Sequence, residues 1–166
     1  MNMRPRMNTA RGSLLVPAVV VAVLASPATA RAELGSTTTL NGSTPPGVMA
    51  PLSGISVMLD TVQADGNRLL IAQGVRKPGT RAPIHYHDFG GHTCVLSGTI
   101  TDFVEGQEPM TFPAGTCYEM PPRVAMTAAN LGSEDVRLID TFTTPPGAPA
   151  IIVLEPGWPD LTDPTG

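Results

Sequence analysis

The sequence has little charge, and most of the charge it has is acidic. Of the 166 residues, 14% are charged, the formal net charge is −4, and lysine occurs only once, at Lys77. No stretch gathers the lysines and arginines that bind phosphate backbones or anionic lipid headgroups. The composition therefore argues against nucleic acid and anionic membrane surfaces as partners.

The sequence also lacks an apolar run long enough to cross a membrane as a helix. The run Leu14–Ala25 has 12 residues and contains Pro17, whereas a spanning helix needs about 20 apolar residues. Three cations precede this run: Arg4, Arg6 and Arg11. Small residues follow it and offer A-x-A cleavage sites ending at Ala30 and Ala32. This pattern predicts a secretory signal peptide over residues 1–32, and the run is too short to favour an uncleaved anchor.

Cleavage after Ala32 would leave residues 33–166, which have six basic and 14 acidic side chains and a net charge of −8. This length suits one domain that is secreted or periplasmic. No cysteine precedes Cys94, so no N-terminal lipid attachment is expected. An oxidising compartment permits a disulfide between Cys94 and Cys117. Two separate buried thiols are the alternative, which spacing alone does not exclude.

Helices of ordinary length have little room in this chain. Glycine and proline account for 31 of the residues after Ala32, and short runs rich in Val, Ile, Leu, Thr and Phe lie between them. This pattern predicts an all-β sandwich or barrel. We expect an extended lead over 33–52, a barrel over 53–155 and a tail over 156–166. Strands are expected at 55–64, 68–75, 83–87, 92–97, 99–104, 107–112, 116–120, 124–129 and 134–142, with hairpins at Asp65-Gly66 and Glu105-Gly106.

All three histidines lie within positions 85–92. His85 and His87 are two residues apart, so on a strand they share one face and can converge on a metal ion. The orientation of His92 depends on the connection before it. A four-residue connection would place His92 on the same face as the pair, and a three-residue connection would turn it away.

Two motifs in this chain resemble those of the cupins, a superfamily of small jelly-roll β-barrels. In the first motif, Gly79 is followed after five residues by His85-Tyr86-His87 and later by Gly98. In the second motif, Gly115 is followed after five residues by Pro121 and later by Asn130. The resemblance covers about residues 53–142 and implies a single cupin-type jelly-roll barrel.

The family usually holds its metal with two histidines and a glutamate from the first motif and a histidine from the second. Here the glutamate position falls on Gly91 or His92, and the second-motif histidine position falls on Met126. We therefore expect His85, His87 and His92 as metal ligands. The open alternatives are completion of the site by Met126 or Cys94, a metal-free pocket, and a structural role for the histidines.

A ligand set without carboxylate suits one divalent transition metal, Fe, Cu, Zn, Ni or Mn, rather than Mg or Ca. The resemblance implies a metal-dependent enzyme, oxygenase-like first and isomerase or lyase second, that acts on a small organic molecule. The alternatives are a non-catalytic cupin that binds a metal or small ligand, and a metal-free structural cupin. Pairing into a homodimer is a further expectation, with the apolar run Ile151–Leu154 as the edge used.

Three polar residues near the histidines each have their own interpretation. Asp88 would orient a ligand histidine, or it would be a solvated turn residue. Arg123 replaces the second-motif glycine and would hold a substrate carboxylate, or it would lie on the surface. Tyr86 alternates with the histidines, so we expect it on the opposite face of the strand.

Overall fold

The computed structural model describes residues 34–158 together with Met1. The chain divides between Ala32 and Glu33, and the account below concerns the part from Glu33 onward. The predicted signal peptide and the last eight residues of the predicted tail, 159–166, lie outside the described residues. In the described part no helix is long and apolar enough to cross a membrane.

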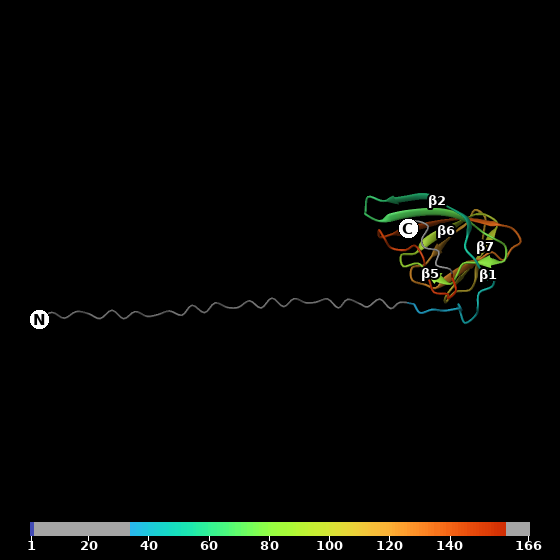
Figure 1. Cartoon of the computed structure of the whole chain (residues 1–166), viewed down its shortest axis with the longest axis horizontal. Coiled ribbons are helices and arrows are strands. Elements are labelled where there is room, and N and C mark those ends of the chain that lie inside the picture. The colour runs from blue at the N-terminus through green and yellow to red at the C-terminus, as the bar shows by residue number, and fades with distance from the viewer. Residues whose placement is uncertain (2–33, 159–166) are drawn as a thin grey trace. The chain divides into compact units, whose positions relative to one another are not determined.

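All regular structure in residues 34–158 is β-strand, arranged in two sheets (Figure 1). The first sheet contains β1 (Val48–Met49), β4 (Thr80–Arg81), β5 (His85–Tyr86), β7 (Thr99–Val104), β8 (Met110–Pro113), β10 (Met126–Ala129) and β12 (Ile152–Val153). The second sheet contains β2 (Ser53–Val62), β3 (Arg68–Arg76), β6 (Gly91–Ser97), β9 (Cys117–Met120) and β11 (Val136–Thr144), in the order β2-β3-β11-β6-β9. The chain crosses repeatedly between the sheets, and the predicted all-β jelly-roll barrel is confirmed.

The expected hairpin at Asp65-Gly66 joins β2 to β3. The Gln63 amide donates to the Asn67 carbonyl at 2.7 Å, and the Asp65 carboxylate accepts from the Asn67 amide at 2.9 Å. Gly66 has a φ of +86°, a left-handed conformation that glycine adopts without strain. Local turn chemistry is therefore sufficient to form this hairpin.

The barrel interior is filled from both sheets by alternate residues of each strand. Its buried apolar members are Val95, Ile100, Val104, Tyr118, Met120, Met126, Val136 and Leu138. Along β6, buried Thr93 and Val95 alternate with exposed His92 and Leu96. This period of two follows from the pleat of the strand.

A second apolar cluster covers the outer face of the first sheet. It contains Leu40, Ile84, Tyr86 and Leu154, so the lead and the C-terminal run both pack against the barrel. Leu40 is 4% exposed, and β1 pairs in parallel with β4. The lead is therefore more ordered than the expected loose segment. Tyr86 lies on the face opposite the histidines, as predicted.

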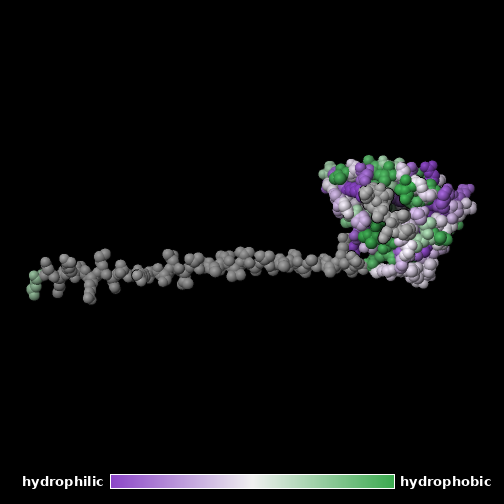
Figure 2. Space-filling model, in the orientation of Figure 1, coloured by the Kyte–Doolittle hydropathy of each residue, from purple (hydrophilic) through white to green (hydrophobic). Residues whose placement is uncertain are grey.

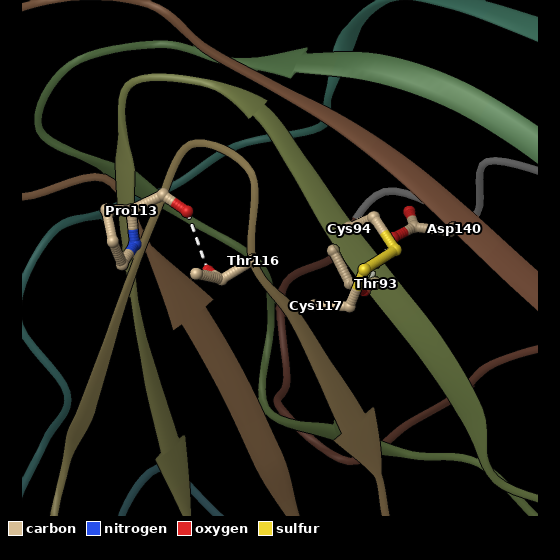
Figure 3. Close-up of a disulfide and its surroundings, with 6 residues drawn as sticks. All are labelled: Thr93, Cys94, Pro113, Thr116, Cys117 and Asp140. Carbon is tan, nitrogen blue, oxygen red and sulfur yellow. Dashed lines mark hydrogen bonds between the residues drawn. A yellow bond between two sulfur atoms is a disulfide. The ribbon is translucent and has the colours of Figure 1, made fainter.

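Cys94 and Cys117 face each other across the antiparallel pair β6–β9 and form a disulfide (Figure 3). Their Cα atoms are 4.0 Å apart, and neither side chain belongs to the barrel interior. The open choice between a disulfide and separate thiols is thus decided by the register of these two strands.

Candidate metal site

Two imidazole rings meet inside the barrel. His85 and His87 are 6% and 2% exposed, and their Nε2 atoms are 3.1 Å apart. The rings are nearly perpendicular, with centroids 4.8 Å apart. The His-x-His spacing on the short strand β5 and the residue after it produces this convergence, as the sequence predicted.

Backbone carbonyls fix the tautomer of both rings. His85 Nδ1 lies 2.8 Å from the Pro83 carbonyl oxygen, and His87 Nδ1 lies 2.6 Å from that of Ala150. A carbonyl oxygen only accepts, so each Nδ1 must carry the proton. In the neutral rings both Nε2 atoms then present lone pairs to one another. A cation shared by the two Nε2 atoms would satisfy both lone pairs. Metal-ligating histidines are usually held in this way, with the other ring nitrogen donating to a carbonyl or carboxylate.

A proton is poorly suited to be that cation. Burial lowers the pKa of His85 to about 3. The neighbouring His87 lowers this pKa further, whereas the hydrogen bond to the Pro83 carbonyl raises it. Burial also lowers the pKa of His87, with the Ala150 carbonyl opposing it. Both imidazoles are therefore neutral near pH 7, which is the form that binds a metal.

The separation of the two nitrogen atoms matches that of adjacent metal ligands. Ligands about 2.0–2.1 Å from a tetrahedral or octahedral ion lie about 2.9–3.4 Å from each other. The observed 3.1 Å falls within this interval. The pair therefore fits two coordination positions of a transition metal.

The structure does not bring His92 to this pair. β5 and β6 belong to different sheets, so the connection between them is not a hairpin and its length does not set the face of His92. His92 is exposed on β6, opposite Glu119 and Thr141, and alternates with the inward Thr93. The described part of the chain contains no group of three His, Cys, Asp or Glu residues placed to hold a metal. The expected three-histidine set is reduced to two, and the disulfide removes Cys94 as a thiolate ligand.

Comparison with known proteins supports the fold assignment. No family model and no curated protein matches the chain. A conserved protein with a double-stranded β-helix domain from Klebsiella pneumoniae is similar in structure, with a TM-score of 0.50, 22% identity, and coverage of 64% of this chain and 90% of its own. This chain has the cupin fold. An RmlC-like cupin from Methanocaldococcus jannaschii has a TM-score of 0.47 at 20% identity, covering 61% of this chain and 91% of its own.

Gly91, one of the two residues on which the cupin glutamate position could fall, lies on the inner face of β6. A Cβ atom at Gly91 would lie 2.7 Å from Phe142 Cδ1 and 2.8 Å from Met120 Cε. Phe142 also stacks on the His87 ring, with centroids 5.2 Å apart. Apolar groups thus fill the space that a side chain at position 91 would need.

The second cupin motif contributes Met126 and Arg123. Met126 is directly opposite His85 in the β10–β5 pair and is 1% exposed, so its side chain shares the inner face with the histidines. Arg123 has a φ of +61°, the conformation expected of the glycine it replaces. Its amide donates to the His87 carbonyl at 2.7 Å, and its guanidinium pairs with Asp88 at 2.8 Å. Asp88 therefore braces this turn, while both histidine Nδ1 atoms bind carbonyls.

An ion pair on the first sheet anchors the segment that enters the site. Arg81 Nη1 and Nη2 donate to the Glu155 carboxylate at 2.6 and 2.7 Å, and the Ile84 amide donates to the same carboxylate at 2.8 Å. The Ile84 carbonyl accepts from the amides of Leu154 and Glu155. The residue before His85 is thus held on both its amide and its carbonyl.

Sequence reasoning missed a set of charged and polar side chains inside the barrel. Its members are Arg76, Thr93, Asp102, Tyr118 and Asp140. The Thr93 hydroxyl donates to Asp140 at 2.6 Å (Figure 3), and Arg76 donates to the Ala50 carbonyl. Within residues 34–158, Asp102 Oδ1 and Arg76 Nε are buried and have no hydrogen-bond partner. The available signal was alternation: Asp102 lies between inward Ile100 and Val104, and Asp140 follows inward Leu138.

The buried acids make stability depend on pH. Burial raises the pKa of Asp102 from 3.8 to about 7, against the effect of the Phe103 amide, and burial also raises the pKa of Asp140. Burial lowers the pKa of Arg76 to about 10. A raised acid pKa means that the folded state holds a proton that the unfolded state has released. Stability is therefore lost as pH rises from about 4 through 7.

We expect Asp102→Asn to remove part of this pH dependence. Between pH 4 and 8, the unfolding free energy of the unmodified chain should fall more steeply than that of the variant. One pKa unit corresponds to about 1.4 kcal/mol, so the losses of the two proteins should differ by at most roughly 4 kcal/mol. Tyr118, Asp140 and Arg76 interact electrostatically in this interior and remain in both proteins. Denaturant unfolding at each pH measures the effect, with exposed Asp135→Asn as the control. Parallel curves for Asp102→Asn and the unmodified chain would contradict it.

Proposed function

We propose that this chain is an exported cupin that binds one transition metal through Nε2 of His85 and His87 and acts on a small organic molecule, with oxygenase-like chemistry first. The observation that supports this is the convergence of two neutral imidazoles whose lone pairs face each other at 3.1 Å. Two buried acceptors at this distance without a shared cation would be unfavourable.

The donor set selects the class of metal. Imidazole nitrogen suits Fe, Cu, Zn or Ni, whereas Mg, Ca and Mn favour oxygen ligands. Met126 is the neighbouring residue able to add a third ligand, and its thioether would shift the preference toward copper. With few protein ligands, a bound ion would keep open positions and supply Lewis acidity or, for iron or copper, electron transfer.

The remaining interior residues define the surroundings of a substrate. Phe142 stacks on the His87 ring, and Met120 lies with Phe142 against Gly91. In the part of the chain that the structure describes, Arg76 Nε and Asp102 Oδ1 are buried without a hydrogen-bond partner, and a small polar molecule that reached them would find a donor and an acceptor. Both groups would gain by pairing with it, because an unpaired buried polar group costs about 1–3 kcal/mol.

A non-catalytic metal- or ligand-binding cupin is the second candidate. It is favoured by the absence, in the described residues, of a third His, Cys, Asp or Glu donor at the pair. Among the described residues the two rings contact backbone carbonyls and each other, and no carboxylate is hydrogen-bonded to either ring. Binding alone would need no such group.

The test is metal retention by the purified chain. Stripped protein is offered Fe, Cu, Zn, Ni and Mn separately and analysed for its metal content after desalting. We expect close to one equivalent of at least one metal, and retention of none would overturn the proposal. Oxygen uptake with a panel of diketones and phenols then separates the two candidates, because a binding protein would show none.

A further inference from the structure

The disulfide between Cys94 and Cys117 lies on the outer face of the second sheet, within reach of small molecules in solution (Figure 3). Cys94 is half-buried on β6, and Cys117 is exposed on β9. Among the described strands β9 pairs only with β6, so the disulfide lies at one margin of the sheet. Access to a sulfur atom is a condition for thiol–disulfide exchange, and Cys117 meets it.

His92 and Glu119 form the next outward-facing pair of the same ladder. Cys94 pairs with Cys117, and His92 pairs with Glu119. Side chains two residues apart on a strand share a face and are separated by about 7 Å along it. The His92 imidazole therefore lies on the same face as the sulfur of Cys94, one step along the ladder. Histidine is the side chain suited to give and take a proton near neutral pH.

The other neighbours of the disulfide are mainly apolar. Exposed Leu96 is the next outward residue of β6 on the side away from His92, and Ile139 of β11 pairs with Cys94. Figure 2 shows the same mixture of hydrophilic and hydrophobic residues on the face of the domain drawn there. The disulfide thus has a group that can donate a proton on one side and an aliphatic side chain on the other.

Few charges surround the two sulfur atoms. The titratable or charged side chains that face outward from β6, β9 and β11 are His92, Glu119 and Arg137. The turn 113–116, which leads into β9, contains no ionisable side chain. A thiolate formed at Cys94 would therefore have His92 as the proton donor on its own strand.

The two strands remain paired without the disulfide. Tyr118 and Met120 of β9 are 7% and 5% exposed and belong to the barrel interior. Beyond the disulfide, the Val95 amide donates to the Thr116 carbonyl at 2.9 Å, and the Gly115 amide donates to the Val95 carbonyl at 2.8 Å. Opening the disulfide therefore leaves the two thiols opposite each other, so that the bond can form again.

We propose that Cys94 and Cys117 form a redox-active disulfide that exchanges electrons with low-molecular-weight thiols, with His92 as the proton donor to the departing sulfur. A thiolate RS⁻ attacks Cys117 Sγ, the bond to Cys94 breaks, and the Cys94 thiolate takes a proton from His92. A second thiolate attacks the mixed disulfide and releases RSSR, and the Cys117 thiolate takes a proton from solvent. Two RSH are thus oxidised to RSSR while the disulfide is reduced to two thiols, and His92 regains its proton from solvent. The proposal is independent of the metal site, so either can fail without the other.

The first test equilibrates the purified chain with glutathione at increasing ratios of reduced to oxidised form. Free thiols are alkylated and counted by mass spectrometry, while circular dichroism follows folding. We expect two thiols to appear in a chain that stays folded, and an excess of oxidised glutathione should restore the disulfide. A disulfide that glutathione opens only in denaturant, or a reduced chain that unfolds, would overturn the proposal.

The second test compares His92→Gln with Leu96→Gln in the rate of reduction by 2-mercaptoethanol. The rate constant per attacking thiolate at pH 6 should fall at least about 10-fold in His92→Gln, since a positioned proton donor commonly contributes more than this. Leu96→Gln should react like the unmodified chain, because its side chain is exposed on the other side of the disulfide.

A pH series separates proton donation from a structural role for His92. Imidazole gives up its proton as pH rises, so the rate constant of the unmodified chain should fall toward that of His92→Gln. The rate constant of the variant, expressed per thiolate, should stay constant. Equal slowing in Leu96→Gln, or a difference between His92→Gln and the unmodified chain that does not change with pH, would refute the role of His92.

Discussion

Replacing His87 by glutamine is expected to lower the affinity for a transition metal by at least about 100-fold, more than the 10–100-fold loss typical of outer-shell changes. His85 and His87 are the two imidazoles that converge, and one alone no longer chelates an ion. Competition with a chromophoric chelator measures the affinity. His85→Gln should also lower the affinity, because each Nε2 faces the other and each Nδ1 is held by a carbonyl.

Two further variants make this test specific. His92→Gln should leave the affinity unchanged, since His92 is exposed on the outer face of β6. Met126→Leu keeps the volume of the side chain but removes the thioether, so a selective loss of copper affinity would identify sulfur as the third ligand. A loss with His92→Gln as large as that with His87→Gln would refute the two-histidine assignment.

The thermal stability of the metal-free proteins tests independently whether the two Nε2 lone pairs oppose each other. In the stripped protein the two Nε2 acceptors face each other without a cation. In the His87→Gln chain, the amide nitrogen of the introduced glutamine would instead donate to His85. The metal-free variant should therefore unfold at a temperature no lower than the stripped unmodified chain. A large loss of stability would show that the histidines serve mainly to pack the core.

Breaking the Arg81–Glu155 pair is expected to cost about 3–5 kcal/mol of stability, since removing one partner leaves a buried charge uncompensated. The two side chains are 5% and 8% exposed and make two hydrogen bonds to each other. Arg81→Met and Glu155→Gln should each lower the unfolding free energy measured with denaturant. The double variant should recover part of the loss, because neither charge remains.

The pair Lys77–Asp135 provides the control for this experiment. Its N–O distance is also 2.6 Å, but its side chains are 54% and 48% exposed. Lys77→Met should therefore cost no more than about 1 kcal/mol. Equal losses at the two pairs would show that burial does not set the energy. Burial raises the pKa of Glu155, but hydrogen bonds from Arg81 and the Ile84 amide outweigh burial, and the pKa is lowered. The contribution of the pair is therefore present above pH 4.5 and is lost as pH falls.

The sequence by itself determined the fold class and the histidine pair, because both depend on local periodicity. Turn residues recur too often for helices, and the β-rich runs between them predict an all-β sandwich or barrel. The resemblance of the two motifs to those of cupins then implies a jelly roll. His85 and His87 share a face because side chains alternate along an extended chain. The turn at Asp65-Gly66 also follows from local chemistry, and the structure agrees with it.

Only the tertiary structure decided the rest of the site. His92 turns away because β5 and β6 enter different sheets, which no count of connecting residues reveals. The disulfide depends on the β6–β9 register, and the tautomer of His87 depends on Ala150, which is 63 residues distant along the chain. Phe142, from β11, fills the space beside Gly91. These features are contacts between distant segments, and their geometry is set when the two sheets close around one interior.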